Sequence, residues 1–376
     1  MQFRNSLERW GSVAKFFHWA IVLLVICQFA LALLADDLPV GVEKLKLLAR
    51  HKSIGITILA LATLRLLWRA ANRTPALPPT MAAWEKFSSK AAHALLYVLL
   101  FVVPLAGWTM SSAKNFPVSW FGLVQLPDFV APNESTYEIA HGIHETLAMT
   151  LGIVAVLHLL AALKHHFVNR DAVLKRMWPF ARVPVVLITM AIAAVAMPGQ
   201  SLAAQPPGAT LRGSGADSTL AFNFTQAGAG TNGSFKAFTT TLMTGEDGAP
   251  ASLEVTIDVK SIDTGDKERD GLLRDKDLFD VKRFAEAKFA ATRFTREASG
   301  RYQAIGKLTI RDVTRDVTLP FALTEMPGGG APGWLLAGEI VINRLDYGVG
   351  QGEWRDTGMV GNAVTVRYSV KLAPVP

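Results

Sequence analysis

The sequence predicts a chain in two parts, a bundle of membrane-spanning α-helices followed by an all-β domain of antiparallel strands. Half of the 376 residues are hydrophobic and only 18% are charged, against about a quarter in soluble globular proteins. Long apolar runs fill the first half, whereas hydrophobic and polar residues alternate from about Leu211 onward. This composition excludes a disordered chain and argues against an ordinary cytosolic enzyme.

Five apolar stretches approach the ~20 residues that a helix needs to cross a membrane. They are Phe16–Ala35, Ile54–Trp68, Ala91–Met110, Ile143–Leu163 and Val183–Met197. Tryptophans lie near their ends, where interfacial aromatic residues are favoured. We therefore expect four helices within residues 1–180 and a fifth within residues 181–204.

The basic residues predict the orientation of these spans. The N-terminus and the second and fourth connections hold 13 of the 18 Lys and Arg in residues 1–182, and the other two connections hold five. By the positive-inside rule the N-terminus is cytoplasmic, and five spans place the β domain outside. Because residues 183–376 carry 20 Lys and Arg against 21 Asp and Glu, the net charge of +7 arises in the first half and does not indicate nucleic-acid binding.

The fifth stretch resembles the hydrophobic core of a signal peptide, because small residues follow it up to a cleavage-like junction after Ala203. Its internal position favours a retained membrane anchor over a processed segment. Residues 205–215 are rich in Pro, Gly and Ala and are expected to form a linker.

Residues 216–376 have the period of two that is typical of strands, as in Leu220, Phe222 and Phe224. This pattern fits an antiparallel sheet, a sandwich or a small barrel that holds one ligand. Asp266–Phe284 lacks the alternation and is expected to be a loop with a short helix. The single cysteine, Cys27, excludes an intramolecular disulfide and a multi-cysteine metal site.

All eight histidines lie at or before His166, and four of them are spaced as two pairs. His144 and His158 are 14 residues apart, which is ~21 Å along a helix with a net rotation of only about 40°, so they share one helix face. The topology places His51 level with His144 and His18 level with His158. Two His pairs at two depths suit axial ligation of two b-type haems.

An alternative is that these histidines form hydrogen bonds with neighbouring helices or line a polar pocket. His93 could contact a haem propionate or a quinone head group, or simply form an interfacial hydrogen bond. His141 fits the shared helix face less well than His144. His165 and His166 follow Lys164 in a basic segment and are expected to be solvated or lipid-facing.

Residues ~1–180 resemble the bacterial cytochrome b561 family of four-helix di-haem membrane proteins. The resemblance rests on the following motifs: Lys15–Trp19, Arg50–Gly55, His93–Tyr97, Pro104–Trp108, His141–Glu145, His158 and Lys164–Phe167. It implies that His18, His51, His144 and His158 ligate the iron of two haem b groups in the inner membrane of a bacterium. It also implies electron exchange with ubiquinone or a related quinone.

Residues ~212–376 resemble the YceI family of periplasmic lipocalin-like barrels that bind polyisoprenoids. The carrying motifs are Ser261–Thr264, Arg269–Asp270, Leu273–Asp280, Gly306–Arg315 and Ile342–Gly348. The chain has Leu272 where many members have His, and residues 212–376 contain no His, which argues against metal or acid–base chemistry. The residues expected to line the ligand cavity are Phe222, Phe224, Phe235, Phe321 and Trp334. Asp263, Asp270, Arg274 and Asp275 are interpreted as a charged surface cluster that fixes a loop by salt bridges.

These expectations combine into a membrane cytochrome that moves electrons between a periplasmic one-electron donor and the quinone pool. The donor could be a protein or superoxide, which would make the chain a superoxide:ubiquinone oxidoreductase. Five basic residues on the outer side could attract an anion or contact lipid head groups: Lys44, Lys46, Arg50, Lys52 and Lys114. The alternatives are a cytochrome subunit of a hydrogenase or dehydrogenase, and a polyisoprenoid carrier anchored by the membrane half.

Overall fold

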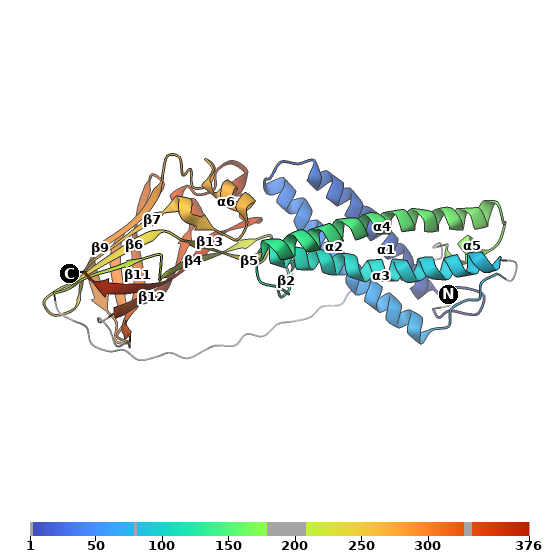
Figure 1. Ribbon diagram of the computed structural model, residues 1–376, viewed down its shortest axis with the longest axis horizontal. Coiled ribbons are helices and arrows are strands. Elements are labelled where there is room, and N and C mark those ends of the chain that lie inside the picture. The colour runs from blue at the N-terminus through green and yellow to red at the C-terminus, as the bar shows by residue number, and fades with distance from the viewer. Residues whose placement is uncertain (1–2, 79–80, 179–207, 327–332, 376) are drawn as a thin grey trace. The chain divides into compact units, whose positions relative to one another are not determined.

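The structure is a computed structural model that describes residues 3–78, 81–178, 208–326 and 333–375 (Figure 1). Contacts divide the chain near residue 193 into two compact units, one helical and one built of strands, and each is described by itself. The expected fifth helix and the junction after Ala203 lie outside the described residues.

The helical unit contains four helices that are long and apolar enough to cross a membrane, as the sequence predicts. They are α1 (Ser12–Asp36), α2 (Val42–Ala71), α3 (Ala83–Ala113) and α4 (Glu134–Phe167), and a short helix α5 (Val173–Met177) follows. α2 begins twelve residues before the apolar run that predicts it, because the charged segment that precedes the run is also helical. The apolar run therefore marks only the second half of the helix.

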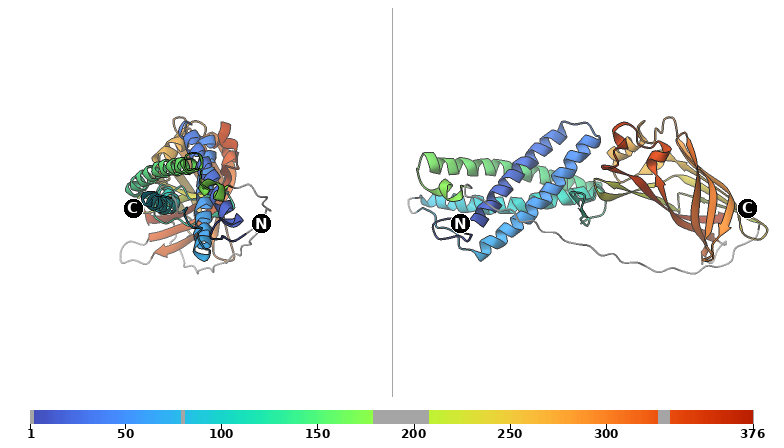
Figure 2. Two further views of the ribbon diagram at one scale, coloured as in Figure 1. Left: turned by 90° about the vertical axis from the view of Figure 1, so that its right-hand side faces the viewer. Right: turned by 180° about the vertical axis from the view of Figure 1, so that it is seen from behind.

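The four long helices form two hairpins that cross obliquely, α1 with α2 and α3 with α4 (Figures 1 and 2). Ile21, Ile58, Ala62 and Leu100 form one buried cluster where three of these helices meet. Many other apolar side chains on the long helices are exposed, as expected for surfaces that face lipid.

A two-stranded hairpin connects α3 to α4 and is fixed onto α2. Its strands are β1 (Ser119–Trp120) and β2 (Val124–Gln125). The Ser53 hydroxyl lies 3.1 Å from the Ser119 carbonyl oxygen and accepts a hydrogen bond from the Phe121 backbone N–H at 3.0 Å. Since Ser53 is two residues after His51, the hairpin lies at the same end of the helical unit as that histidine.

The second unit is an antiparallel barrel of eight strands in up-and-down order, several of them broken into segments. The segments are β3 (Thr210–Ser214), β4 (Thr219–Gln226), β5 (Ala229–Phe235), β6 (Phe238–Thr244), β7 (Pro250–Asp258), β8 (Ile262–Asp263), β9 (Glu286–Arg296), β10 (Tyr302–Ile310), β11 (Val313–Met326), β12 (Gly333–Asn343) and β13 (Val360–Pro374). β3 lies within residues 205–215, which the composition predicts to be linker. Its backbone pairs with β6 and β13, so the barrel begins earlier than expected.

The last strand closes the barrel. β13 pairs with β12 along its length and with β3 and β4 on its other side. A closed ring leaves no free sheet edge, and this closure decides between the sheet, sandwich and barrel that the alternation alone permits.

One end of the barrel is filled by side chains and the other is covered by short helices. At the filled end lie six buried apolar residues from five strands: Leu211, Leu242, Phe321, Leu323, Trp334 and Leu372. The opposite end is covered by α6 (Lys267–Arg274) and the loop 275–285, together with the 3₁₀ helices η2 (Arg344–Tyr347) and η3 (Gly352–Arg355). We call these covering segments the cap. α6 lies in the region predicted to be a loop with a short helix.

Candidate functional site: two histidine pairs and an apolar barrel cavity

The helical unit brings His51 on α2 and His144 on α4 face to face. Their ring centres are 6.2 Å apart with an angle of 74° between the ring planes. Both imidazoles are half-buried. This is the pair that the positive-inside rule predicts to lie at the outer side of the membrane.

His144 is held by α3. Its Nδ1 lies 2.9 Å from the Val103 carbonyl oxygen. A ring N–H at Nδ1 that donates to this carbonyl leaves Nε2 with a free electron pair, which is the tautomer a metal ligand needs. Gly107, one turn after Val103, makes room for the ring, because a Cβ there would lie 2.9 Å from His144 Cε1.

His18 on α1 and His158 on α4 form a second pair. Their ring centres are 6.4 Å apart, with 83° between the ring planes. The His18 Nδ1 and the His51 Nδ1 are buried without a hydrogen-bond partner. The structure therefore brings together the four histidines that the helical spacing pairs.

A third histidine joins the second pair. The ring centre of His93 on α3 is 5.0 Å from that of His158, closer than His18 is. His93 Nδ1 lies 2.6 Å from the Ser89 carbonyl oxygen, so this ring is fixed to its own helix. Helical spacing on α4 contains no information about α3, and for this reason the sequence does not reveal the contact.

The two pairs fit the axial positions of haem iron. A metal–imidazole bond of about 2.0 Å plus about 1.1 Å from the nitrogen to the ring centre puts two ring centres about 6 Å apart across one metal ion. The observed 6.2 and 6.4 Å agree with this distance. Within the described ranges no three His, Cys, Asp or Glu side chains gather as a site for a bare metal ion. Each pair could supply two ligands, which is the number that a porphyrin-bound iron still requires.

Two arginines lie beside the second pair. The guanidinium groups of Arg65 and Arg69 on α2 lie 5.2 and 5.5 Å from the centre of the Tyr97 ring on α3. Tyr97 is one turn after His93. Basic groups at this position can pair with the carboxylates of a bound cofactor, and this role was not assigned from the sequence.

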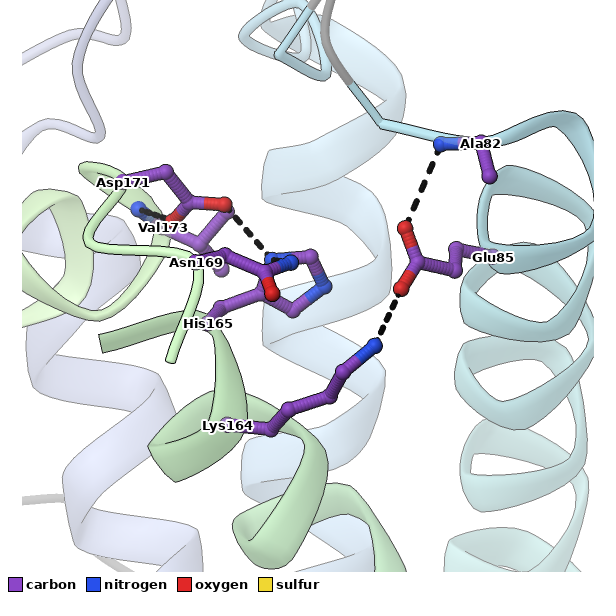
Figure 3. Close-up of polar contacts among 7 residues, drawn as sticks. All are labelled: Ala82, Glu85, Lys164, His165, Asn169, Asp171 and Val173. Atoms are coloured by element: carbon purple, nitrogen blue, oxygen red, sulfur yellow. Dashed lines mark hydrogen bonds and ion pairs between the residues drawn. The ribbon is translucent and has the colours of Figure 1, made fainter. Parts of the chain in front are cut away.

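The end of α4 differs from the solvated or lipid-facing segment that the sequence predicts. His165 is 8% exposed, and its Nδ1 lies 2.6 Å from the Asp171 carboxylate, beside Asn169 (Figure 3). Lys164 forms an ion pair with Glu85 at 2.5 Å, which ties α4 to the start of α3 (Figure 3). The chain turns back after α4, and residues 169–173 cover His165.

Most of the five basic residues that the sequence predicts on the outer side have partners in the protein. Lys44 donates to the Leu38 carbonyl, Lys46 pairs with Glu43, and Lys52 donates to the Phe116 carbonyl. Lys114 lies 4.0 Å from the centre of the Tyr137 ring. Arg50 is exposed. Their charges remain on the surface of the helical unit.

The barrel encloses an apolar cavity beneath the cap. The volume of this cavity is about 200 Å³. Phe222, Phe224 and Phe235 line this cavity, as the sequence predicts. Phe321 and Trp334 do not, because they belong to the close-packed filled end, where both are at most 2% exposed. The side chains of all five residues point into the barrel. Only their position along the barrel decides whether they line the cavity or fill the closed end.

The predicted surface cluster divides into buried and exposed members. Asp270 is 6% exposed, and its Oδ1 accepts hydrogen bonds from the Thr264 N–H and hydroxyl at 2.9 and 2.6 Å. Its neighbour Arg269 is also buried, and burial lowers its pKa to about 10. Interpreting Asp270 as a surface charge is therefore wrong: it fixes the loop before α6 from within. Asp263 forms an ion pair with Lys236, and the Gly265 N–H donates to its carboxylate and lowers its pKa.

The fold and the two sites define a membrane cytochrome b joined to a closed β-barrel with an apolar cavity. Comparison with family models gives a match of residues 9–180 to prokaryotic cytochrome b561 and of residues 214–372 to the YceI-like domain. The chain belongs to the cytochrome b561 family through its first half and to the YceI-like family through its second. Membership of the cytochrome b561 family implies b-type haem.

Individual relatives cover each half. Cytochrome b561 homolog 2 of Escherichia coli (strain K12) is 34% identical over 180 residues, which are 47% of this chain and 95% of that protein. The probable superoxide oxidase CybB of Yersinia pestis is 30% identical over 166 residues, or 44% and 93%. The crystal structure of Burkholderia cenocepacia BcnA is 31% identical, covers 42% of this chain and 97% of that one, and has a TM-score of 0.38.

Proposed function

We propose that the helical unit binds two b haems and transfers electrons between a one-electron donor outside the membrane and the quinone pool. The observation that carries the proposal is the pair of facing imidazole contacts, His51 with His144 and His18 with His158, at 6.2 and 6.4 Å. When bound, the haem irons supply one-electron redox chemistry.

The protein's own residues prepare these positions. His144 and His158 lie on one face of α4, so a single helix contributes one ligand to each site. The Val103 carbonyl orients the His144 ring, and Gly107 leaves the space for it. Arg65 and Arg69 provide positive charge beside the second pair, where a haem propionate would find partners.

The chain is placed in the inner membrane of a bacterium, with the N-terminus in the cytoplasm and the barrel in the periplasm. This orientation rests on the distribution of Lys and Arg and on the single further crossing expected within residues 181–204. The His51–His144 pair is then the outer site.

Superoxide is the donor that we favour. The Yersinia relative is called a probable superoxide oxidase, and the basic residues predicted on the outer side, of which Arg50 is exposed, would raise the local concentration of a small anion. A cytochrome subunit that serves a hydrogenase or dehydrogenase is the alternative, with a protein as donor.

The barrel is proposed to hold the apolar chain of a polyisoprenoid, including that of an isoprenoid quinone. Its apolar cavity and the YceI-like family carry this part of the proposal. A barrel joined to the cytochrome by residues 179–207 stays at high effective concentration near it. A second function, that of an anchored isoprenoid carrier, uses the same cavity without electron transfer.

A reduced-minus-oxidised absorbance spectrum of the purified chain, with haem counted per chain, tests the first part. We expect two b haems in the wild type, one in His144→Gln and two in His141→Gln, because His141 lies on the same helix but outside both pairs. A full haem count in His144→Gln would exclude the outer pair as a ligand set.

Stopped-flow mixing with superoxide, with and without added ubiquinone, tests the donor. We expect superoxide to reduce the haem, as seen in its absorbance spectrum, and the haem to be reoxidised only when quinone is present. If superoxide leaves the haem oxidised but a hydrogenase or dehydrogenase reduces it, the chain is instead a cytochrome subunit of such an enzyme.

A further inference from the structure

The hairpin between α3 and α4 carries exposed apolar side chains. Phe121 and Leu123 in its turn are 52% and 72% exposed, and Val124 of β2 is 41% exposed. Residues 115–127 contain no Asp, Glu, Lys or Arg. Exposed apolar residues that cluster in this way mark a surface that contacts lipid or another protein, whereas single ones are ordinary. Water is therefore not the natural surroundings of this hairpin.

Several polar groups of the hairpin are hydrogen-bonded within the helical unit. The Phe121 N–H donates to the Ser53 hydroxyl at 3.0 Å. Within the turn, the Leu123 N–H donates to the Trp120 carbonyl oxygen, also at 3.0 Å. The Trp120 ring N–H donates to the Thr57 hydroxyl at 3.1 Å. At membrane depth, a backbone that is not helical is tolerated only where the protein supplies its hydrogen bonds, and these bonds allow the hairpin to lie against lipid.

The neighbouring helix α1 shows how deep the hairpin lies. Ser53 and Thr57, which hold the hairpin, flank Gly55, and a Cβ on Gly55 would lie 3.1 Å from the side-chain amide nitrogen of Gln28 on α1. Leu34 lies ~9 Å farther along α1 toward its connection with α2 and is 58% exposed. Because α1 is a candidate membrane span, this leucine faces lipid. The hairpin is therefore attached to α2 at a level where the adjacent helix surface is still in the apolar layer.

We propose that the hairpin, residues 119–125, lies in the lipid border of the leaflet on the side of the outer site, with Phe121, Leu123 and Val124 among the acyl chains. The lipid-facing surface of α1 and α2 then continues onto the hairpin. Lipid is favoured over a protein partner because the apolar surface of α1 extends beyond the level at which the hairpin is attached. Trp120, which is 37% exposed, is of the residue type favoured at the border of a membrane.

Cysteine labelling of the full chain in lipid nanodiscs tests this inference. Each variant carries Cys27→Ser and one new substitution. Leu123→Cys probes the hairpin, Leu23→Cys on the exposed surface of α1 is the lipid reference, and Ser135→Cys at the exposed, polar start of α4 is the water reference. A charged, water-soluble maleimide reacts with the thiolate, and apolar surroundings suppress the thiolate.

We expect Leu123→Cys to react at least about tenfold more slowly than Ser135→Cys, because a rise of one unit in the thiol pKa lowers the thiolate fraction by that factor. Its rate should be near that of Leu23→Cys. The rates of the same cysteines in the unfolded chain correct for intrinsic differences in reactivity. Val124→Cys on the adjoining strand takes the place of Leu123→Cys if the latter lowers the temperature of thermal unfolding.

Labelling of Leu123→Cys at the rate of Ser135→Cys would overturn the inference and place the hairpin in water. If a hydrogenase or dehydrogenase then slowed this labelling, the apolar patch would be a docking surface for a protein. A phospholipid with a diazirine on its acyl chain supplies a second measurement on the wild type. After illumination, mass spectrometry should find lipid adducts on residues 119–125 as well as on α1, and adducts on α1 without any on the hairpin would overturn the inference.

Discussion

Gly107 on α3 lies directly against the imidazole of His144 on α4. A Cβ on residue 107 would be 2.9 Å from His144 Cε1 and 3.0 Å from Nδ1, closer than side-chain carbons normally approach. The absence of a side chain at this position thus allows His144 to reach the Val103 carbonyl and to face His51.

This relationship predicts that Gly107→Ala displaces His144. Overpacking of this kind costs about 1–3 kcal/mol. We expect a lower haem content or an altered spectrum at the outer site, with the second site retained. Gly142→Ala is the matched control, because a Cβ there meets nothing within 4 Å. Equal spectra for the two variants would contradict the prediction.

The buried carboxylate of Asp270 predicts a stability difference within the charged cluster. Asp270→Ala leaves the Thr264 N–H and hydroxyl without their acceptor and should lower the free energy of unfolding by about 1–3 kcal/mol. Asp275→Ala, at an exposed position three residues after Leu272, should change it by less than about 0.5 kcal/mol. Denaturant unfolding of the full chain, followed by a signal from the barrel, measures both.

The hydrogen bonds of Arg311 hold the cap in place, so we expect their loss to loosen it. Its Nη1 donates to the carbonyl oxygens of Lys276, Leu278 and Gly348, and so joins two segments of the cap. Arg311→Ala should speed the exchange of bound isoprenoid by roughly 10- to 100-fold, from the loss of charged hydrogen bonds worth about 1.5–3 kcal/mol. Exchange against labelled ligand is the measurement, and Arg293→Ala on the exposed face of β9 should leave the rate unchanged.

The burial of Tyr368 leads us to expect that the barrel loses stability at alkaline pH. Burial raises the pKa of this phenol, so the folded state favours the protonated form. The stabilisation is complete below the unfolded pKa of about 10 and is lost as the pH rises above it. The melting temperature of the wild type should fall more steeply above pH ~10 than that of Tyr368→Phe, and parallel curves would refute this assignment.

Much of the architecture follows from local sequence patterns. The apolar runs predict the four long helices, since a spanning helix satisfies its own backbone hydrogen bonds and needs only an apolar surface. The alternation after residue 211 predicts the strands, because side chains point alternately to the two faces of a strand. The start of the barrel is missed because the Pro, Gly and Ala of residues 205–215 suggest a linker, whereas pairing with β6 and β13 makes Thr210–Ser214 a strand.

The candidate site depends on both levels of structure. The sequence by itself determined that His144 and His158 share a helix face, because the helical period is a property of the chain alone. Only the tertiary structure decided that His93 approaches His158, and that Phe222 lines a cavity while Trp334 fills the barrel end. These contacts join residues from different helices, or depend on position along a closed barrel, and helix crossing and barrel closure set them rather than the spacing of residues in the chain.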